Sequence, residues 1–177
     1  DGSCIGNGKT DAKGASAILF PNGEIEGGAY YLDPRVVRTN NKQEYYAVIK
    51  AMELVNEYDP SHTKVIHVYT DSMLLINTCT KWMESWKRNG WKKNSPGEIK
   101  NLDLIQILYK YCQERKIKWT HVKAHKKDDS FETTWNNKVD KCAYDAACID
   151  DISGIVLENK DHLTPSITSF FKKRKTG

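Results

Sequence analysis

Four acidic residues lie at positions where an ionised carboxylate is unfavourable unless it is paired or bound to a metal ion. Asp71 ends a run of β-branched and aromatic residues that starts at Val65, which predicts a buried strand with the acid at its carboxyl end. Glu44 lies on the apolar stripe of a predicted helix, where an acid is rare unless something pairs with it. Asp1 opens the first strand pattern, and Asp140 lies at the edge of the apolar face of a late helix.

Converging carboxylates would repel one another unless divalent cations lay between them, and their oxygens suit Mg²⁺ or Mn²⁺. Two such ions about 3.5–4 Å apart can activate a water and stabilise the leaving oxygen in phosphodiester cleavage. Each acid also has an ordinary explanation. Asp71 can cap the following helix, Glu44 can be a first-turn residue stabilised by the helix dipole, and Asp140 can be a surface residue. Spacing alone leaves these alternatives open.

The first third of the chain predicts a meander of three antiparallel strands followed by a helix. The strands start at Asp1 and continue over 14–20 and 24–32, with a hairpin at Pro21-Asn22-Gly23. Asn40, as N-cap, and Gln43 have the spacing of a capping box. The helix that follows buries a stripe with helical spacing, which consists of Ala47, Val48, Ala51, Leu54 and Val55.

The next part alternates strands, over 65–70 and 117–122, with helices, over 102–112 and 135–147. The helix after Asp71 should bury Leu74, Leu75, Cys79, Trp82, Met83 and Trp86. At its end, tryptophans are interleaved with basic residues from Lys81 to Lys93. Indoles can pack against the domain while the basic side chains face nucleic-acid phosphates; a solvated helix end is the alternative.

Composition favours one globular domain with a tail. The 177 residues are 39% hydrophobic, enough for a sizeable core, and no apolar run approaches the roughly 20 residues of a membrane span. We therefore expect no membrane association. The five cysteines form no CxxC pair, so neither a disulfide framework nor a zinc site is indicated, and a reducing compartment is expected. We see no signal peptide.

Six motifs, in this order, make residues 1–148 resemble ribonuclease H of the type 1 class. They are Asp1-Gly2-Ser3-Cys4 with Asn7, Thr39-Asn40-Asn41-x-x-Glu44, Tyr69-Thr70-Asp71-Ser72, Trp82-x-x-x-Trp86-Lys87-x-x-Gly90-Trp91-Lys92, His121-Val122-x-x-His125 and Asn136-x-x-x-Asp140. The resemblance implies a ribonuclease H-like α/β fold with a five-stranded mixed sheet flanked by helices. It also implies a monomeric endonuclease that hydrolyses the RNA strand of RNA/DNA hybrids with two Mg²⁺ ions, leaving 5′-phosphate and 3′-hydroxyl ends; Mn²⁺ is a second candidate metal.

The resemblance also assigns roles to single residues. The metal ligands would be Asp1, Glu44, Asp71 and Asp140, and His125 would assist proton transfer or product release. Contacts to the hybrid, including the 2′-hydroxyls that distinguish RNA from DNA, would come from Cys4, Asn7, Asn40 and Asn41. A basic protrusion that grips the DNA strand would consist of Trp82, Trp86, Lys87, Arg88, Trp91 and Lys92.

The sequence departs from the family pattern in three places. The family has an apolar half-strand before its first catalytic aspartate, so we expect further residues upstream of Asp1. The spacing from His125 to Asp140 is longer than is usual in the family. Ala124 stands where the family has a glycine.

Residues 149–177 form a tail of different character. Its Thr164-x-x-Ile167-x-x-Phe170-Phe171 resembles the peptide by which replication and repair proteins bind a sliding clamp, with Thr164 in place of the usual glutamine. Ile167, Phe170 and Phe171 would then contact the clamp. The alternatives are that these side chains pack on the domain, or that Lys172–Lys175 is only a nuclear address. The expected location is intracellular, in the nucleus or at sites of DNA replication.

Two rival functions remain at this stage. A catalytically silent hybrid-binding module, or a domain derived from a retroelement, would share the fold; the presence of all four acids argues against silence. A transposase or integrase of the same superfamily is a rival enzyme class, but the tryptophan-rich basic segment and the Thr39-Asn40-Asn41-x-x-Glu44 helix argue against it.

Overall fold

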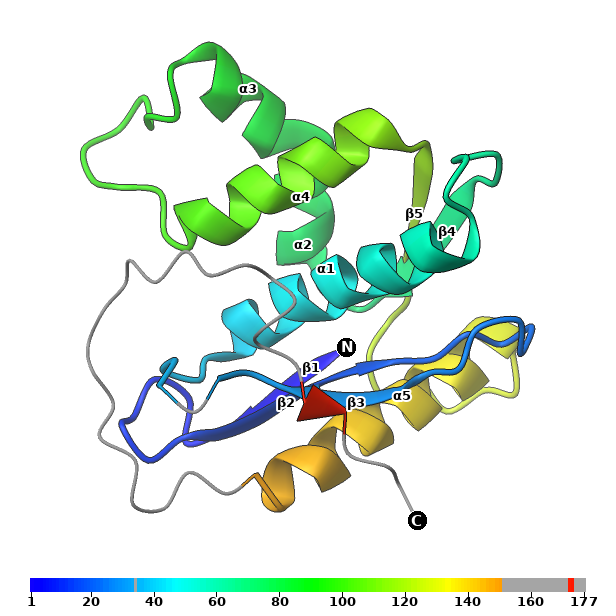
Figure 1. Cartoon of the computed structure of the whole chain (residues 1–177). Coiled ribbons are helices and arrows are strands. Elements are labelled where there is room, and N and C mark those ends of the chain that lie inside the picture. The colour runs from blue at the N-terminus through cyan, green and yellow to red at the C-terminus, as the bar shows by residue number, and fades with distance from the viewer. Residues whose placement is uncertain (34, 151–171, 174–177) are drawn as a thin grey trace.

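The computed structural model describes residues 1–33, 35–150 and 172–173. Its first sheet contains β1 (Gly2–Ile5), β2 (Lys13–Ile18) and β3 (Gly28–Tyr31), all antiparallel. This confirms the predicted meander, although the connection between β2 and β3 is longer than a tight hairpin. The short β6 (Lys172–Lys173) pairs with the outer edge of β3. The chain therefore returns from its tail to the first sheet (Figure 1).

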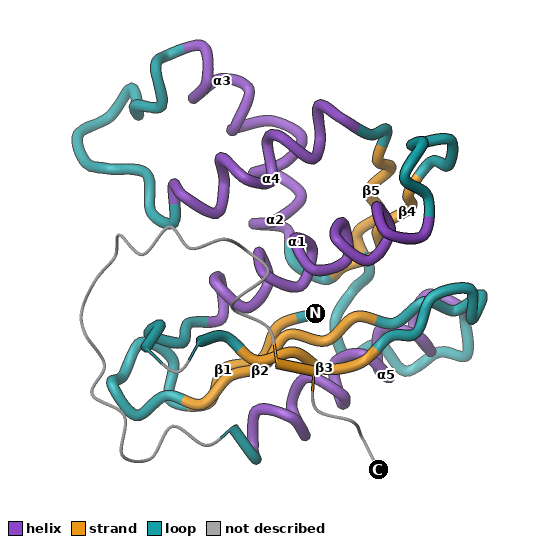
Figure 2. The backbone as a smooth tube through the Cα atoms, in the orientation of Figure 1, coloured by secondary structure: helices purple, strands orange, loops and turns teal. Residues whose placement is uncertain are grey.

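Two helices cover opposite faces of this sheet, α1 (Asn40–Tyr58) on one side and α5 (Phe131–Cys148) on the other (Figures 1 and 2). Thr39 caps α1, since its side chain accepts from the backbone N–H of Lys42; the expectation that Asn40 is the N-cap was wrong by one residue. Ser130 caps α5, which starts four residues before the predicted Trp135. The earlier start adds a helical turn beside the acidic residues.

The second layer contains a parallel pair, β4 (Ile66–Thr70) and β5 (Ile117–His121), and four helical segments. Three of these segments follow one another as α2 (Met73–Asn77), a π-helical turn η1 (Thr78–Trp82) and α3 (Met83–Arg88), and α4 (Leu102–Glu114) packs beside them. A π-turn inserts an extra residue per turn and rotates the side chains that follow. Trp82, predicted to be buried, is the last residue of this turn and is 38% exposed.

The main core lies between α1, α4 and the α2–α3 segment. Its best-buried side chains include Ile49, Met52, Leu75, Ile105 and Leu108. Burial of these side chains holds the second layer on α1, so α1 is the element that joins the two layers (Figure 2).

The predicted single five-stranded sheet is divided in two, with β4 and β5 apart from the other strands. Asp1 extends the β1–β2 ladder: its amino group donates to the carbonyl of Ala17, and its carbonyl accepts from the backbone N–H of Ala17. Beyond Ala17, an apolar cavity of about 470 Å³ separates β2 from β4. Val65 and Tyr69 are therefore 50% and 39% exposed, in contrast to the buried strand expected from their sequence.

Two described residues lie beyond residue 148, the predicted end of the catalytic domain. Ile149 and Asp150 follow α5, and the backbone N–H groups of both bond to its last turn. The clamp-like residues Ile167, Phe170 and Phe171 lie outside the described residues. Within the described part of the chain, no helix combines the length and apolar character needed to span a membrane.

Candidate active site

Three of the four predicted acids come together. The carboxylates of Asp1, Glu44 and Asp71 each offer an oxygen, and these oxygens lie within 4.8 Å of one another. Asp1 precedes β1, Glu44 is in the first turns of α1, and Asp71 follows β4. The turn at Asp71 is local, because Ser72 caps α2 through its hydroxyl and donates its backbone N–H to Thr70 Oγ1. Three separate segments thus converge at the carboxyl end of β4.

Close packing between β1 and α1 orients Glu44. The backbone N–H of Gly2 donates to Glu44 Oε1 over 3.3 Å. A Cβ at position 2 would lie 2.5 Å from backbone atoms of Gln43 and Glu44, so only glycine permits this approach. Burial raises the pKa of the Glu44 carboxyl, and the nearby charges of Asp71 and Asp140 raise it further, against the lowering effect of the amino group of Asp1 and the Gly2 hydrogen bond. A cation at this point would offset that cost.

Asn136 is a contact that the sequence did not assign to the site. Its side-chain amide donates to Asp71 Oδ2 at 3.4 Å, and the residue is buried. The second turn of α5 thus lies beside the end of β4. The signal available in the sequence was its position four residues before Asp140, which places both on one helical face.

Asp140 stands beside the three-acid cluster rather than in it. Its Oδ2 lies 3.8 Å from His125 Nδ1, and its charge reaches Glu44. The His125 side chain is 81% exposed, and its backbone has a φ of +53°, in the left-handed region. The loop thus presents an exposed imidazole at the edge of the acidic site.

The residues expected to touch nucleic acid occupy two surfaces. On the first, the Asn7 side chain accepts from the backbone N–H of Asn40 at 2.9 Å, linking the β1–β2 turn to the start of α1. Asn7, Asn40 and Asn41 are exposed and Cys4 is half-buried. This surface lies next to Asp1 and Glu44 in the chain. Contact with a hybrid stays a prediction.

On the second surface, tryptophans pack while basic side chains face solvent. The Trp82 and Trp86 rings lie 6.0 Å apart, and Trp91 packs edge-on against Tyr109 at 5.5 Å. Lys87, Arg88 and Lys92 are exposed, with Arg88 3.8 Å from Glu84. The basic side chains face solvent as expected, while Trp82 is more exposed than expected; contact of this surface with nucleic acid stays a prediction.

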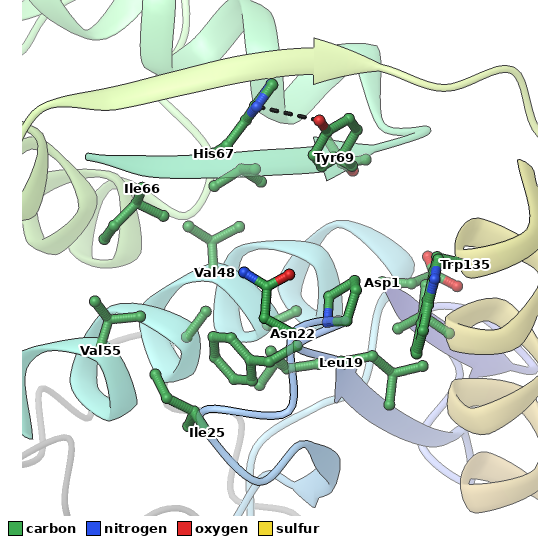
Figure 3. Close-up of a pocket in the computed structure, with 18 of the residues that line it drawn as sticks. Asp1, Leu19, Asn22, Ile25, Val48, Val55, Ile66, His67, Tyr69 and Trp135 are labelled. Atoms are coloured by element: carbon green, nitrogen blue, oxygen red, sulfur yellow. Dashed lines mark hydrogen bonds between the residues drawn. The ribbon is translucent and has the colours of Figure 1, made fainter. Parts of the chain in front are cut away.

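The cavity between the sheets ends at the acids. Figure 3 shows Asp1 and Trp135 at one end of it and Ile25 and Val55 at the other. The lining is mostly aliphatic and aromatic, with Asp1 and Glu44 among its few charged members. Polar groups along β4 are partly satisfied by each other, since Tyr69 OH and His67 Nδ1 lie 3.1 Å apart. The partly buried carboxylates of Asp1 and Glu44 therefore border the cavity.

The donor set fits a hard divalent cation. Among the described residues, no lysine or arginine side chain lies within ion-pair distance of the Asp1, Glu44 or Asp71 carboxylates. Oxygen-only ligands at such spacing favour Mg²⁺ or Mn²⁺. Fold and site together define an α/β protein of the metal-dependent phosphodiesterase class.

Comparison with known proteins identifies the family within this class. The profile of the family described as RNase H matches residues 1–148. Ribonuclease H of Acetivibrio thermocellus is 35% identical over 146 residues, covering 82% of this chain and 89% of the relative. Ribonuclease H of Ehrlichia ruminantium is 39% identical over 127 residues, or 71% of this chain and 79% of the relative. The chain belongs to the ribonuclease H family, whose members are metal-dependent endonucleases that hydrolyse the RNA strand of RNA/DNA hybrids.

Solved structures agree on the fold. LC9-RNase H1, a type 1 enzyme, superimposes with a TM-score of 0.59 at 24% identity, covering 90% of this chain and 75% of that one. The RNase H domain of PFV gives a TM-score of 0.63 at 21% identity, covering 85% and 93%. The ribonuclease H-like α/β fold is thus confirmed.

Proposed function

We propose that Asp1, Glu44, Asp71 and Asp140 hold two Mg²⁺ ions, with Mn²⁺ as a substitute, and that this site cuts the RNA strand of RNA/DNA hybrids. The observation that carries the proposal is the 4.8 Å convergence of the Asp1, Glu44 and Asp71 carboxylates, with Asp140 adjacent. Cations held by these carboxylates would supply activation of a water and stabilisation of the leaving oxygen. The products are a 5′-phosphate and a 3′-hydroxyl.

The chain's own groups orient these ligands. In this proposal Asp1 would hold the ions together with Glu44 and Asp71. Gly2 N–H holds one oxygen of Glu44, and the Asn136 amide holds one oxygen of Asp71. His125, exposed and 3.8 Å from Asp140, carries a proton or assists departure of the product.

The hybrid spans two surfaces in this proposal. Cys4, Asn7, Asn40 and Asn41 read the RNA strand, including its 2′-hydroxyls, and the exposed Lys87, Arg88 and Lys92 bind phosphates of the DNA strand. Support comes from LC11-RNase H1, a structural relative at a TM-score of 0.55 and 19% identity, whose structure was determined in complex with an RNA/DNA hybrid.

The test is cleavage of an end-labelled RNA/DNA hybrid with Mg²⁺, beside double-stranded RNA and double-stranded DNA of the same sequence. The chain and its Asp71→Asn variant are compared. Cutting of the hybrid alone, lost in the variant, is the expected result. Tight binding of the hybrid without cutting by the unaltered chain would instead favour a silent hybrid-binding module or a retroelement-derived domain.

For the tail, we propose that Ile167, Phe170 and Phe171 bind a sliding clamp and that the protein acts in the nucleus at sites of DNA replication. The support is the sequence motif and the basic residues Lys172–Lys175 that follow it. Titration calorimetry with a purified clamp tests the contact. Binding that is lost in a Phe170→Ala/Phe171→Ala variant is expected, and equal binding by that variant would reject the motif. A nuclear signal from a fluorescent fusion, lost when Lys172–Lys175 become alanine, tests the location.

A further inference from the structure

A buried ion pair links Arg38 to Asp150, which follows the residues matched by the family profile. Asp150, two residues after the last matched position, is 4% exposed. Its Oδ2 accepts from Arg38 Nε and from the backbone N–H of Gly14, both at 3.0 Å. Arg38 is 1% exposed and immediately precedes Thr39, the cap of α1. The pair thus joins the end of α5 to β2 and to the start of α1.

Arg38 uses its remaining donors on the loop before α1. Its Nη1 donates to the carbonyls of Asp33 and Val36 at 2.9 and 2.6 Å, and its Nη2 donates to that of Leu32 at 3.1 Å. A planar guanidinium can satisfy several carbonyls at fixed angles, which the single ammonium of a lysine cannot. Arg38 therefore ties down the described residues on both sides of position 34, and its bond to Asp150 fixes the direction of its side chain.

The same network reaches the residues assigned to hybrid binding. The carbonyl of Arg38 accepts from the backbone N–H of Gly8 at 3.3 Å, next to Asn7. Asn7 in turn accepts from the N–H of Asn40. The charges of Arg38 and Asp150 also act on the thiol of Cys4, whose pKa burial raises. The turn that carries Asn7 is thus hydrogen-bonded both to the backbone of Arg38 and to the start of α1 at Asn40.

We propose that Arg38 and Asp150 are positioning residues for hybrid binding: together they set the placement of Asn7 and Asn40, and through them the affinity for substrate. The inference rests on the proposed function, because it takes the hybrid contacts from there. Neither residue touches the acidic cluster through any hydrogen bond found in the described part of the chain. Losing the pair should therefore raise KM and leave kcat nearly unchanged.

The molecule contains a matched control at the other end of α1. Arg115 and Asp59 form a second buried pair, with Nη1 to Oδ2 at 2.6 Å, and Arg115 also donates to Asn56 Oδ1 and to the carbonyls of Asp59 and Lys64. Since α1 has 19 residues, its ends lie roughly 28 Å apart. The two pairs share their chemistry, but only Arg38–Asp150 adjoins the predicted hybrid contacts.

The experiment compares Asp150→Asn with Asp59→Asn, at a temperature where circular dichroism shows both folded. We expect Asp150→Asn to raise KM for the hybrid about tenfold, comparable to the loss of one or two hydrogen bonds, with kcat within about twofold. Asp59→Asn should leave both constants within about twofold of the unaltered chain even if it lowers the melting temperature as much. If Asp150→Asn does not fold, Arg38→Lys against Arg115→Lys replaces the comparison.

Amide hydrogen exchange at Gly8 and Asn40 separates this inference from the proposed function. Exchange there should accelerate in Asp150→Asn and not in Asp59→Asn. Unchanged exchange, an unchanged KM, or an equal rise in KM for both variants would each overturn the inference. If the unaltered chain does not cut the hybrid, the proposed function fails, and hybrid affinity measured by fluorescence anisotropy, with the same tenfold expectation, decides the inference in place of KM.

Discussion

The two sides of the acidic cluster are built differently. On the side of β1 and α1, Ser16 Oγ donates to the backbone and side-chain oxygens of the fully buried Gln43 at 2.7 and 2.9 Å, which fixes the first turn of α1 that bears Glu44. On the side of β4 and α5, Tyr69 and Phe131 are 39% and 52% exposed beside the cavity. One wall of the site is supported by buried hydrogen bonds, and the other borders open space.

The two walls differ in how firmly hydrogen bonds among the described residues hold their acidic side chains in place. Glu44 is held by its own helix and by Gly2. Asp71 is held by the end of β4 and by a single long hydrogen bond from Asn136 at 3.4 Å. The wall bearing Asp71 should therefore respond to what fills the cavity, while the wall bearing Glu44 should respond to substitutions in its buried network.

The largest expected effect tests whether both walls serve one site. Asp71→Asn and Glu44→Gln should each lower kcat by at least about a thousandfold, or roughly 4 kcal/mol of transition-state stabilisation. Because the two acids act as a unit, the double variant should lose little more than either single one. Single-turnover cleavage of a labelled hybrid measures the loss. Asp145→Asn, an exposed acid of α5 paired with Lys141, is the control and should cut normally.

Fully additive losses, or a Glu44→Gln variant of normal rate, would show that the two walls do not share a site. Hybrid affinity should remain close to that of the unaltered chain in each case, because the acids are not the groups that bind the phosphates of the DNA strand in this proposal.

The next largest effect concerns the open wall. An extension of about five alternating valine and threonine residues before Asp1 should continue the ladder past Ala17, given about 3.3 Å per strand residue, and fill the cavity beside β4. Covering side chains such as Tyr69 and Phe131 should add about 2–4 kcal/mol to the free energy of unfolding. Urea unfolding measures it, against an extension of the same length made of glycine and serine. Equal stability of the two extended chains would contradict this account of the cavity.

The sequence predicts most of the first wall and less of the second. The strand patterns are local signals, so the three-stranded meander could be predicted. The convergence of Asp1, Glu44 and Asp71 was expected only through the resemblance to ribonuclease H, because spacing alone left each acid with an ordinary explanation. The Arg38–Asp150 pair could not, because its members are 112 positions apart and each resembles a solvent-exposed residue in sequence. No local sequence pattern predicts the π-turn that ends at Trp82, or the exposure of its side chain.

A smaller effect tests the supported wall. A Cβ at position 14 would lie 2.5 Å from Gln43 Nε2 and 2.9 Å from Arg38 Cγ, both in buried side chains with little room to move. Gly14→Ala should therefore lower the free energy of unfolding by about 1–3 kcal/mol through overpacking. Chemical denaturation checks this, with Lys13→Ala on the exposed neighbouring position as the control. A neutral Gly14→Ala would mean that the supported wall is more adaptable than its packing indicates.

The smallest effect is a pH dependence specific to the metal-free protein. Burial raises the pKa of Glu44 in the folded state, so between its ordinary pKa of about 4.3 and the raised value the folded chain holds a proton that the unfolded chain has released. The stabilising contribution is complete below the ordinary pKa and is lost as pH rises through the folded pKa. Thermal unfolding in EDTA should thus show stability declining with pH across this window, and Glu44→Gln should remove that part of the decline. Mg²⁺ should reverse it in the unaltered chain and have a weaker effect in Glu44→Gln, because the cation compensates the charge that the proton otherwise neutralises. An identical pH dependence of thermal stability for the unaltered chain and Glu44→Gln in EDTA would contradict this prediction. It would mean that ionisation of Glu44 does not destabilise the metal-free folded protein.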